Sequence, residues 1–148
     1  MIMNKKGFTL VELLATMVIL ALIASVAIPN VVKIMSNNKK GKVINDGMTL
    51  IAQAKKKISS DYDLRESINE VGVNYSLDVL DNYNDIINDP DGVTYNRANS
   101  YVKIYKVDNT VTYCVYLESD NWILKNASSC VLENELLSDN SKKYVNEN

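Results

Sequence analysis

Residues 8–32 form an apolar run that carries a single charge, the carboxylate of Glu12, and that directly follows a basic pair and a glycine. Residues 13–32 carry no charge at all, and about twenty helical residues are enough to cross the hydrocarbon core of a bilayer. An ionisable side chain near the start of such a helix is costly in lipid, which indicates a function and a specific partner.

Three interpretations of this run compete. A plain membrane anchor explains the apolar residues but leaves Glu12 without a role. A secretory signal cut after Ala27 fits only loosely, because Glu12 would then lie inside its apolar region. A cut between Gly7 and Phe8 removes a short basic leader, keeps the apolar helix, and creates an amine at Phe8. That α-amine, with a pKa near ~8, is a cationic partner for Glu12.

The stretch KKGFTLVELLATMVILALIASVAIP resembles the signature of the type IV prepilin (type IV pilin) family, the class III signal peptide. Gly7, Phe8, Glu12 and Pro29 all stand at the family's spacings, over about 25 residues. The resemblance implies that a membrane-embedded prepilin peptidase cuts after Gly7 and methylates the Phe8 amine. It also implies that Glu12 faces the Phe8 amine of a neighbouring subunit during assembly. Pro29 is expected to kink the helix, because proline lacks an N–H and crowds the preceding turn.

The implied function is that of a structural subunit of a type IV pilus-like filament, serving adhesion, twitching motility, DNA uptake or secretion. The expected partners are further copies in a helical homo-oligomer, other pilins, the peptidase and the pilus assembly platform. The protein would span the inner (cytoplasmic) membrane once before assembly and lie outside the bacterial cell afterwards. The alternative is a minor pilin, a pseudopilin or a filament-tip binding module.

The composition of the chain argues against two classes of function, nucleic-acid binding and catalysis. The chain has 16 basic and 18 acidic side chains, a net charge of −2, and no histidine. An acidic balance without a basic patch argues against direct binding of nucleic acid, and the missing histidine removes the commonest general base and metal ligand. The sequence shows no nucleophile paired with a base, no phosphate loop and no metal-ligand spacing. We therefore expect no enzyme activity, no cofactor and no metal.

The expected architecture is α+β, with a long kinked N-terminal helix packed on a small antiparallel sheet. After residue 32 an amphipathic stripe continues the helix to about residue 60, because apolar residues recur there at helical spacings. The predicted segments are a leader at 1–7, a transmembrane or filament-core helix at 8–32, a globular head at 33–137 that includes the amphipathic half of the helix, and a flexible tail at 138–148.

The connector after residue 60 contains capping and turn signals. Asp61 or Asp63 could cap a short helix that ends near Gly72, and Ser76 could cap another through about Tyr83. The motif at residues 88–92 is a turn signal, Asn-Asp-Pro-Asp-Gly. The alternative there is a calcium site formed by three aspartates, since hard cations favour clustered oxygen ligands. These aspartates are Asp85, Asp89 and Asp91.

From Gly92 onward, residues rich in β-branched and aromatic side chains predict an antiparallel meander. The predicted strands are residues 93–97, 101–107, 110–118 and 122–125. Alternation assigns Val111, Tyr113, Val115 and Leu117 to the face against the long helix, and Cys114 and Tyr116 to the other face.

The two cysteines, Cys114 and Cys130, are expected to form a disulfide if the head is extracellular, with two reduced buried thiols as the alternative. Such a bond would fold the segment after Trp122 across the outer face or edge of the sheet. It would close a loop of about 17 residues, worth roughly 3 kcal/mol in the chain-entropy model.

Overall fold

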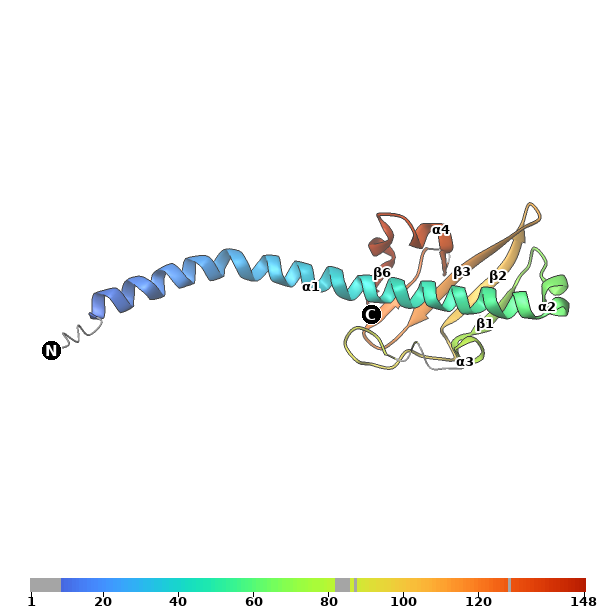
Figure 1. The fold of residues 1–148 in the computed structure, drawn as a ribbon, viewed down its shortest axis with the longest axis horizontal. Helices are drawn as coiled ribbons and strands as arrows, with labels where there is room; N and C mark the ends of the chain where they lie inside the picture. The colour runs from blue at the N-terminus through green and yellow to red at the C-terminus, as the bar shows by residue number, and fades with distance from the viewer. Residues whose placement is uncertain (1–8, 82–85, 87, 128) are drawn as a thin grey trace, which may run out of the picture. The chain divides into compact units, whose positions relative to one another are not determined.

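The computed structural model describes residues 9–81, 86, 88–127 and 129–148. The chain divides into two compact units, one ending at Ser36 and the other running from Asn37 to Asn148. Helix α1, Leu10–Ser60, belongs to both (Figure 1). The second unit adds a six-stranded antiparallel sheet within the described residues, so the predicted α+β architecture of a long helix packed on a sheet is confirmed.

The remaining elements follow in chain order. They are α2 (Tyr62–Ser67), β1 (Val73–Ser76), α3 (Leu77–Leu80), β2 (Tyr101–Val107), β3 (Thr110–Glu118), β4 (Trp122–Leu124), β5 (Val131–Leu132), α4 (Glu133–Leu136), the 3-10 helix η1 (Ser141–Tyr144) and β6 (Val145–Glu147). The strand order is β1-β2-β3-β4-β6, with β5 also paired to β3. The bounds of β2 and β3 are those that the sequence predicts, and β4 is one residue shorter.

The core of the second unit lies between α1 and one face of the sheet. The buried residues of α1 recur every three or four positions, as an apolar stripe on one side of a helix requires. They are Val43, Ile44, Gly47, Leu50, Ile51, Ala54 and Ile58. From the sheet, Val115 and Leu117 contribute fully buried side chains, while Val111 and Tyr113 pack partly buried against the same cluster. The predicted assignment of this face of β3 to the helix is therefore confirmed.

Glycine allows the helix and the sheet to approach closely. A Cβ added at Gly47 would lie 2.8 Å from Cδ2 of Leu124 and 3.4 Å from Cγ1 of Val115. The first distance is much shorter than an ordinary carbon contact, and the second is at the lower edge of one. Two short helices flank this part of α1: Gln53 is hydrogen-bonded to Asp81 at the end of α3, and Lys55 pairs with Glu133 of α4 (Figure 1).

The predicted strand at residues 93–97 is wrong. The segment makes only an isolated bridge, between Asn88 and Thr94. The Asp89 carboxylate accepts hydrogen bonds from the backbone N–H groups of Asp91 (2.8 Å) and Val93 (2.9 Å). These bonds hold the chain in the predicted turn instead of a ladder, because short polar side chains compete with secondary structure for backbone donors.

The connector differs in extent from the prediction. Asp61 caps α2 as expected, its carboxylate accepting from the Leu64 N–H at 3.2 Å, but the helix ends at Ser67. Gly72 then takes a left-handed conformation with φ of +82°, and the chain enters β1, which the sequence analysis missed. Helix α3 ends at Leu80, and the expected end near Tyr83 lies outside the described residues.

The expected flexible tail is instead part of the sheet. Strand β6 pairs with β4, with Val145 opposite Leu124, and the Val145 side chain is fully buried. The last residue is also held, because the Asn148 N–H donates to the Asn121 carbonyl at 2.9 Å. The segment is mostly polar and was therefore expected to be flexible. Burial of its one valine, Val145, stabilises a three-residue edge strand.

Strands β4 and β5 are two pieces of one interrupted partner of β3. Leu117 pairs with Leu124 in β4, and Cys114 pairs with Leu132 in β5. Three steps along β3 therefore correspond to eight steps on its partner, so five extra residues loop out between the two pieces. Cys130 at the end of this loop bonds to Cys114, with a Cα–Cα distance of 5.5 Å. The predicted disulfide is present, and it closes the loop against the sheet.

Candidate functional site

The described part of the first unit is helical, and its apolar side chains are exposed. The described residues 9–35 are all exposed, and α1 is long and apolar enough to cross a membrane by length and composition. The large apolar side chains on this surface include Leu13, Leu14, Met17, Val18, Leu22, Ile23 and Val26. A contiguous apolar surface of this size requires a cover, either lipid or other helices.

Polar side chains within this helix bond to the helix itself. The hydroxyls of Thr16 and Ser25 donate to the carbonyls of Leu13 and Leu22, each at 2.8 Å. The Asn30 amide donates to a carbonyl one turn earlier, at 3.1 Å. Because a polar group without a partner is expensive in lipid, these local bonds make the three residues compatible with a membrane-spanning segment.

Pro29 lies inside α1, which continues through it. Proline has no N–H to donate to the carbonyl four residues earlier, that of Ser25, so one helix hydrogen bond is missing at this point. The kink expected there stays a prediction.

Glu12 and Thr9 form a capping box at the start of α1. The backbone N–H and the hydroxyl of Thr9 donate to Oε2 of Glu12, at 2.9 and 3.0 Å. The Glu12 N–H in turn lies 3.3 Å from the Thr9 hydroxyl oxygen. This reciprocal arrangement satisfies donors at the helix start that have no partner within the helix.

Thr9 is a residue that the sequence analysis missed, although its signal was present. A threonine followed three residues later by glutamate, just before an apolar run, is the sequence pattern of a capping box. Glu12 is described by the structure. Gly7 and Phe8, the two residues of the expected cleavage site, lie outside the described residues.

In the second unit, the loop after α3 is tied to α1 and to the sheet. Lys39 on α1 donates to Oδ1 of Asp91 at 2.5 Å, and the indole N–H of Trp122 donates to its Oδ2 at 2.5 Å. The hydrogen bond from Lys39, together with that from Trp122, holds the pKa of the Asp91 carboxyl below its ordinary value. The hydrogen bond with Asp91 likewise raises the pKa of Lys39, against a smaller opposing effect of desolvation.

The same loop was the candidate calcium site. Both oxygens of the Asp89 carboxylate accept hydrogen bonds, the second from the Ser119 hydroxyl at 2.7 Å. Asp91 is paired as described above, and Asp85 lies outside the described residues. Among the residues that the structure describes, no three acidic, cysteine or histidine side chains gather as a metal site would require. The carboxylates here hold the turn.

Tyr95, which follows this loop, is almost fully buried. Its hydroxyl donates to Oδ2 of Asp46 on α1 at 2.9 Å, and the residue is 1% exposed. Burial raises the pKa of Tyr95 strongly, and the adjacent Asp46 charge raises it further. Tyr95 therefore stays neutral and serves as a structural anchor between the loop and the helix.

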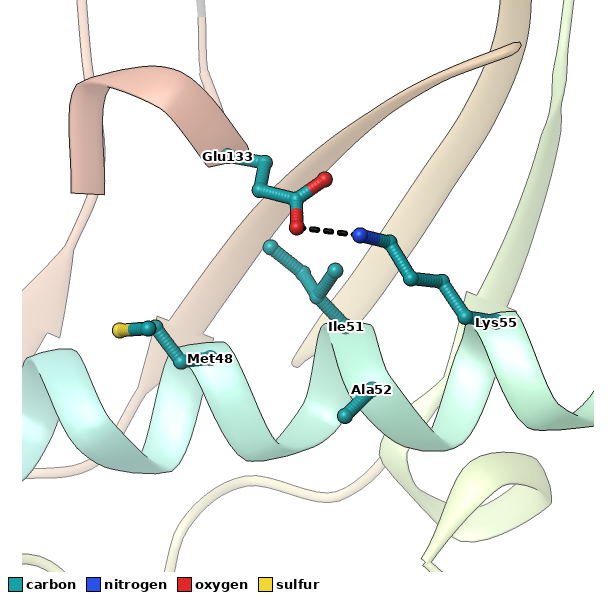
Figure 2. A pocket seen from close by; sticks show the side chains of 5 residues that line it. All are labelled: Met48, Ile51, Ala52, Lys55 and Glu133. Atoms are coloured by element: carbon teal, nitrogen blue, oxygen red, sulfur yellow. Dashed lines mark hydrogen bonds and ion pairs between the residues drawn. The ribbon is translucent and has the colours of Figure 1, made fainter. Parts of the chain in front are cut away.

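A shallow pocket lies between α1 and α4 (Figure 2). Met48, Ile51 and Ala52 form its apolar floor, and the side chains of Lys55 and Glu133 point toward one another and pair at its edge. Lys55 also lies 5.1 Å from the centre of the Tyr113 ring. The five lining residues do not form a convergent set of polar groups of the kind that orients a reacting molecule. We therefore interpret the pocket as a gap in the packing between the two helices.

A second groove lies beside the disulfide loop on the outer face of the sheet. Tyr116, Lys125, Asn126, Ala127 and Ser129 line it. The ring of Tyr116 stacks on Tyr101 with centroids 5.4 Å apart. The Asn126 amide donates to Glu135 at 3.0 Å, which anchors the base of the loop.

Comparison with protein families identifies the N-terminal segment. Residues 2–28 match the family model of the prokaryotic N-terminal methylation motif, the class III signal peptide of type IV pilins. Searches of curated proteins and of solved structures found no match for the chain. The motif supports a type IV pilin-like protein that is exported and processed, and it indicates a structural subunit and not an enzyme family.

Proposed function

We propose that this protein is a structural subunit of a type IV pilus-like surface filament. A prepilin peptidase would cut it between Gly7 and Phe8 and methylate the new amine. The subunit would then wait in the cytoplasmic membrane and assemble with further copies and other pilins on the assembly platform. In the filament the apolar helices lie inside and the heads outside, on the bacterial surface.

One observation carries this proposal: the methylation motif is joined to a helix whose apolar side chains are exposed. The motif spans residues 2–28, and residues 9–35 are exposed. Lipid satisfies this surface before assembly, and neighbouring helices satisfy it afterwards. The free energy of assembly would come mainly from burying these apolar side chains against one another.

In this proposal Glu12 sets the position of each subunit relative to its neighbours in the filament. It is the one charged side chain between residues 8 and 32. A buried carboxylate that meets an amine is strongly favoured over one left alone, even where burying the pair adds little net stability. The proposal therefore pairs Glu12 with the Phe8 amine of a neighbouring subunit, which fixes how far each subunit advances.

The test compares filament yield with the membrane pool. Glu12→Ala, expressed as the only copy, should be inserted and cleaved, because removing a carboxylate makes the helix easier to hold in lipid. Sheared filaments should nevertheless fall sharply in amount. N-terminal mass analysis of the wild-type membrane pool should show N-methylated Phe8. Normal filaments from Glu12→Ala, or a mature chain that begins at Met1 or Ile28, would overturn the assignment.

The abundance of the protein in sheared filaments separates the structural roles. A major pilin dominates the sheared fraction, whereas a minor pilin, a pseudopilin or a tip module is present at a small fraction of it. Quantitative mass spectrometry of purified filaments from the native host measures this ratio directly.

A further inference from the structure

Thr9 provides two of the hydrogen bonds that hold the Glu12 carboxylate. Its backbone N–H and its hydroxyl both donate to Oε2, at 2.9 and 3.0 Å. Within the described residues, no bond to the other oxygen, Oε1, is formed. Two donors on one oxygen fix the position of the carboxylate and the direction in which the second oxygen faces.

The Thr9 hydroxyl also acts as an acceptor: the Glu12 backbone N–H donates to its oxygen, with 3.3 Å between nitrogen and oxygen. A single hydroxyl group therefore sets both the backbone and the side chain of Glu12. In water this would matter little, since solvent offers equivalent partners. In lipid, or between packed helices, no such substitutes exist, so the local donors gain in importance.

The order of events makes these donors useful before any amine is present. Until the leader is removed, the nitrogen of Phe8 is an ordinary peptide N–H and offers Glu12 no cationic amine. Thr9 lies C-terminal to the cut and is present in the precursor and in the mature chain alike. Its two donors can therefore stabilise the carboxylate in both forms.

We propose that Thr9 is a positioning residue for Glu12: its hydroxyl holds one carboxylate oxygen and leaves the other facing outward for the amine of a neighbouring copy of this chain. This inference rests on the proposed filament function. It extends that function by naming the group that orients the assembly carboxylate. The effect belongs to the hydroxyl and not to the size or branching of the side chain.

The chain offers matched variants. Thr9→Val keeps the shape and removes the hydroxyl, while Thr9→Ser keeps the hydroxyl and removes the methyl group. Thr16→Val makes the same chemical change elsewhere on the helix, where the hydroxyl donates to the Leu13 carbonyl. Each variant is expressed as the only copy, and the cleaved membrane pool and the sheared filaments are both quantified.

Thr9→Val should be cleaved normally but should lower filament yield about tenfold, the factor that corresponds to one hydrogen bond to a charged group. Thr9→Ser should restore the yield, and Thr16→Val should assemble like the wild type. Thr9→Val combined with Glu12→Gln should assemble no worse than Glu12→Gln alone, because Thr9 acts through Glu12. Equal yields for Thr9→Val and wild type, equal losses for Thr9→Val and Thr16→Val, or accumulation of uncleaved Thr9→Val would each overturn the proposal.

A second measurement tests the hydrogen bond between the Glu12 N–H and the Thr9 hydroxyl without using filaments. In detergent micelles, hydrogen exchange at the Glu12 amide should be faster in Thr9→Val than in wild type or Thr9→Ser, because its acceptor is lost. Unchanged protection in Thr9→Val would refute the capping role. Absence of the wild-type protein from sheared filaments would instead refute the filament function, while the exchange result would still stand.

Discussion

Gly47 of α1 lies directly beneath Leu124 of β4, so closely that a Cβ at Gly47 would come within 2.8 Å of the leucine Cδ2. Leu124 is fully buried and cannot swing away into solvent. The missing side chain at Gly47 is therefore what allows the helix to lie against the strand at this point.

Gly47→Ala should destabilise the head, although alanine favours the helical conformation more than glycine does. Alanine gains about 1 kcal/mol of helix propensity, but forcing a methyl group into a packed core costs about 1–3 kcal/mol. Gly41 is the matched control, since a Cβ there meets nothing within 4 Å. Thermal unfolding of the full chain in detergent should show a lower Tm for Gly47→Ala and a higher one for Gly41→Ala. A rise in both would mean that the core yields at no cost.

Asp91→Asn should remove a stabilising contribution that depends on pH. The folded-state pKa of Asp91 is below its ordinary value of 3.8. Its contribution is therefore fully present above about pH 3.8 and is lost as the pH falls through the lower folded-state pKa. The Tm difference between wild type and Asp91→Asn should be constant near neutrality and should shrink in acid.

Asp120→Asn, an exposed carboxylate in the turn before β4, serves as the control for this titration. Asp91→Asn should separate from Asp120→Asn at neutral pH and approach it in acid. A Tm difference for Asp91→Asn that grows as the pH falls would contradict the sign of the predicted effect.

Loss of the disulfide should weaken the head without affecting insertion. Replacing both Cys114 and Cys130 by alanine should lower the free energy of unfolding by about 3 kcal/mol. Intact mass before and after reduction with alkylation establishes the bond in protein isolated from the cell surface. Alkylation of natively isolated protein without prior reduction would show free thiols and contradict the bond.

Val145→Ala should destabilise the head by about 2 kcal/mol, because a fully buried valine loses its methyl groups. Val107→Ala is the control: this valine is 47% exposed, so its loss should change stability by less than about 0.5 kcal/mol. Truncation before Val145 should be at least as damaging as Val145→Ala. Wild-type stability after truncation would mean that β6 contributes nothing to the fold.

The parts of the fold that the sequence predicts are those with long periodic signals. Strands β2 and β3 span seven and nine residues of alternating side chains, and their bounds were predicted correctly. Strands β5 and β6 span two and three residues, too few for a pattern, and form because the sheet offers them an edge. The segment at 93–97 had strand propensity, but the Asp89 side chain takes its first backbone donor.

At the N-terminus the sequence predicted the motif that the family comparison confirms, but it did not identify Thr9. The partner assigned to Glu12 was an amine created by cleavage, and that pairing stays a prediction. The partner that the structure shows is local, one helical turn away. The three-residue spacing of threonine and glutamate is the signal for this local hydrogen bond.

The interruption between β4 and β5 leaves the outside of the head open to change. Both ends of residues 125–130 are anchored, one by pairing with β3 and β6 and the other by Cys130. Substitutions or short insertions between these anchors alter no buried contact between α1 and the sheet, because the ladder resumes on the far side whatever the loop contains. Changes of sequence in this segment therefore alter the outer surface of the head while the architecture beneath it stays constant.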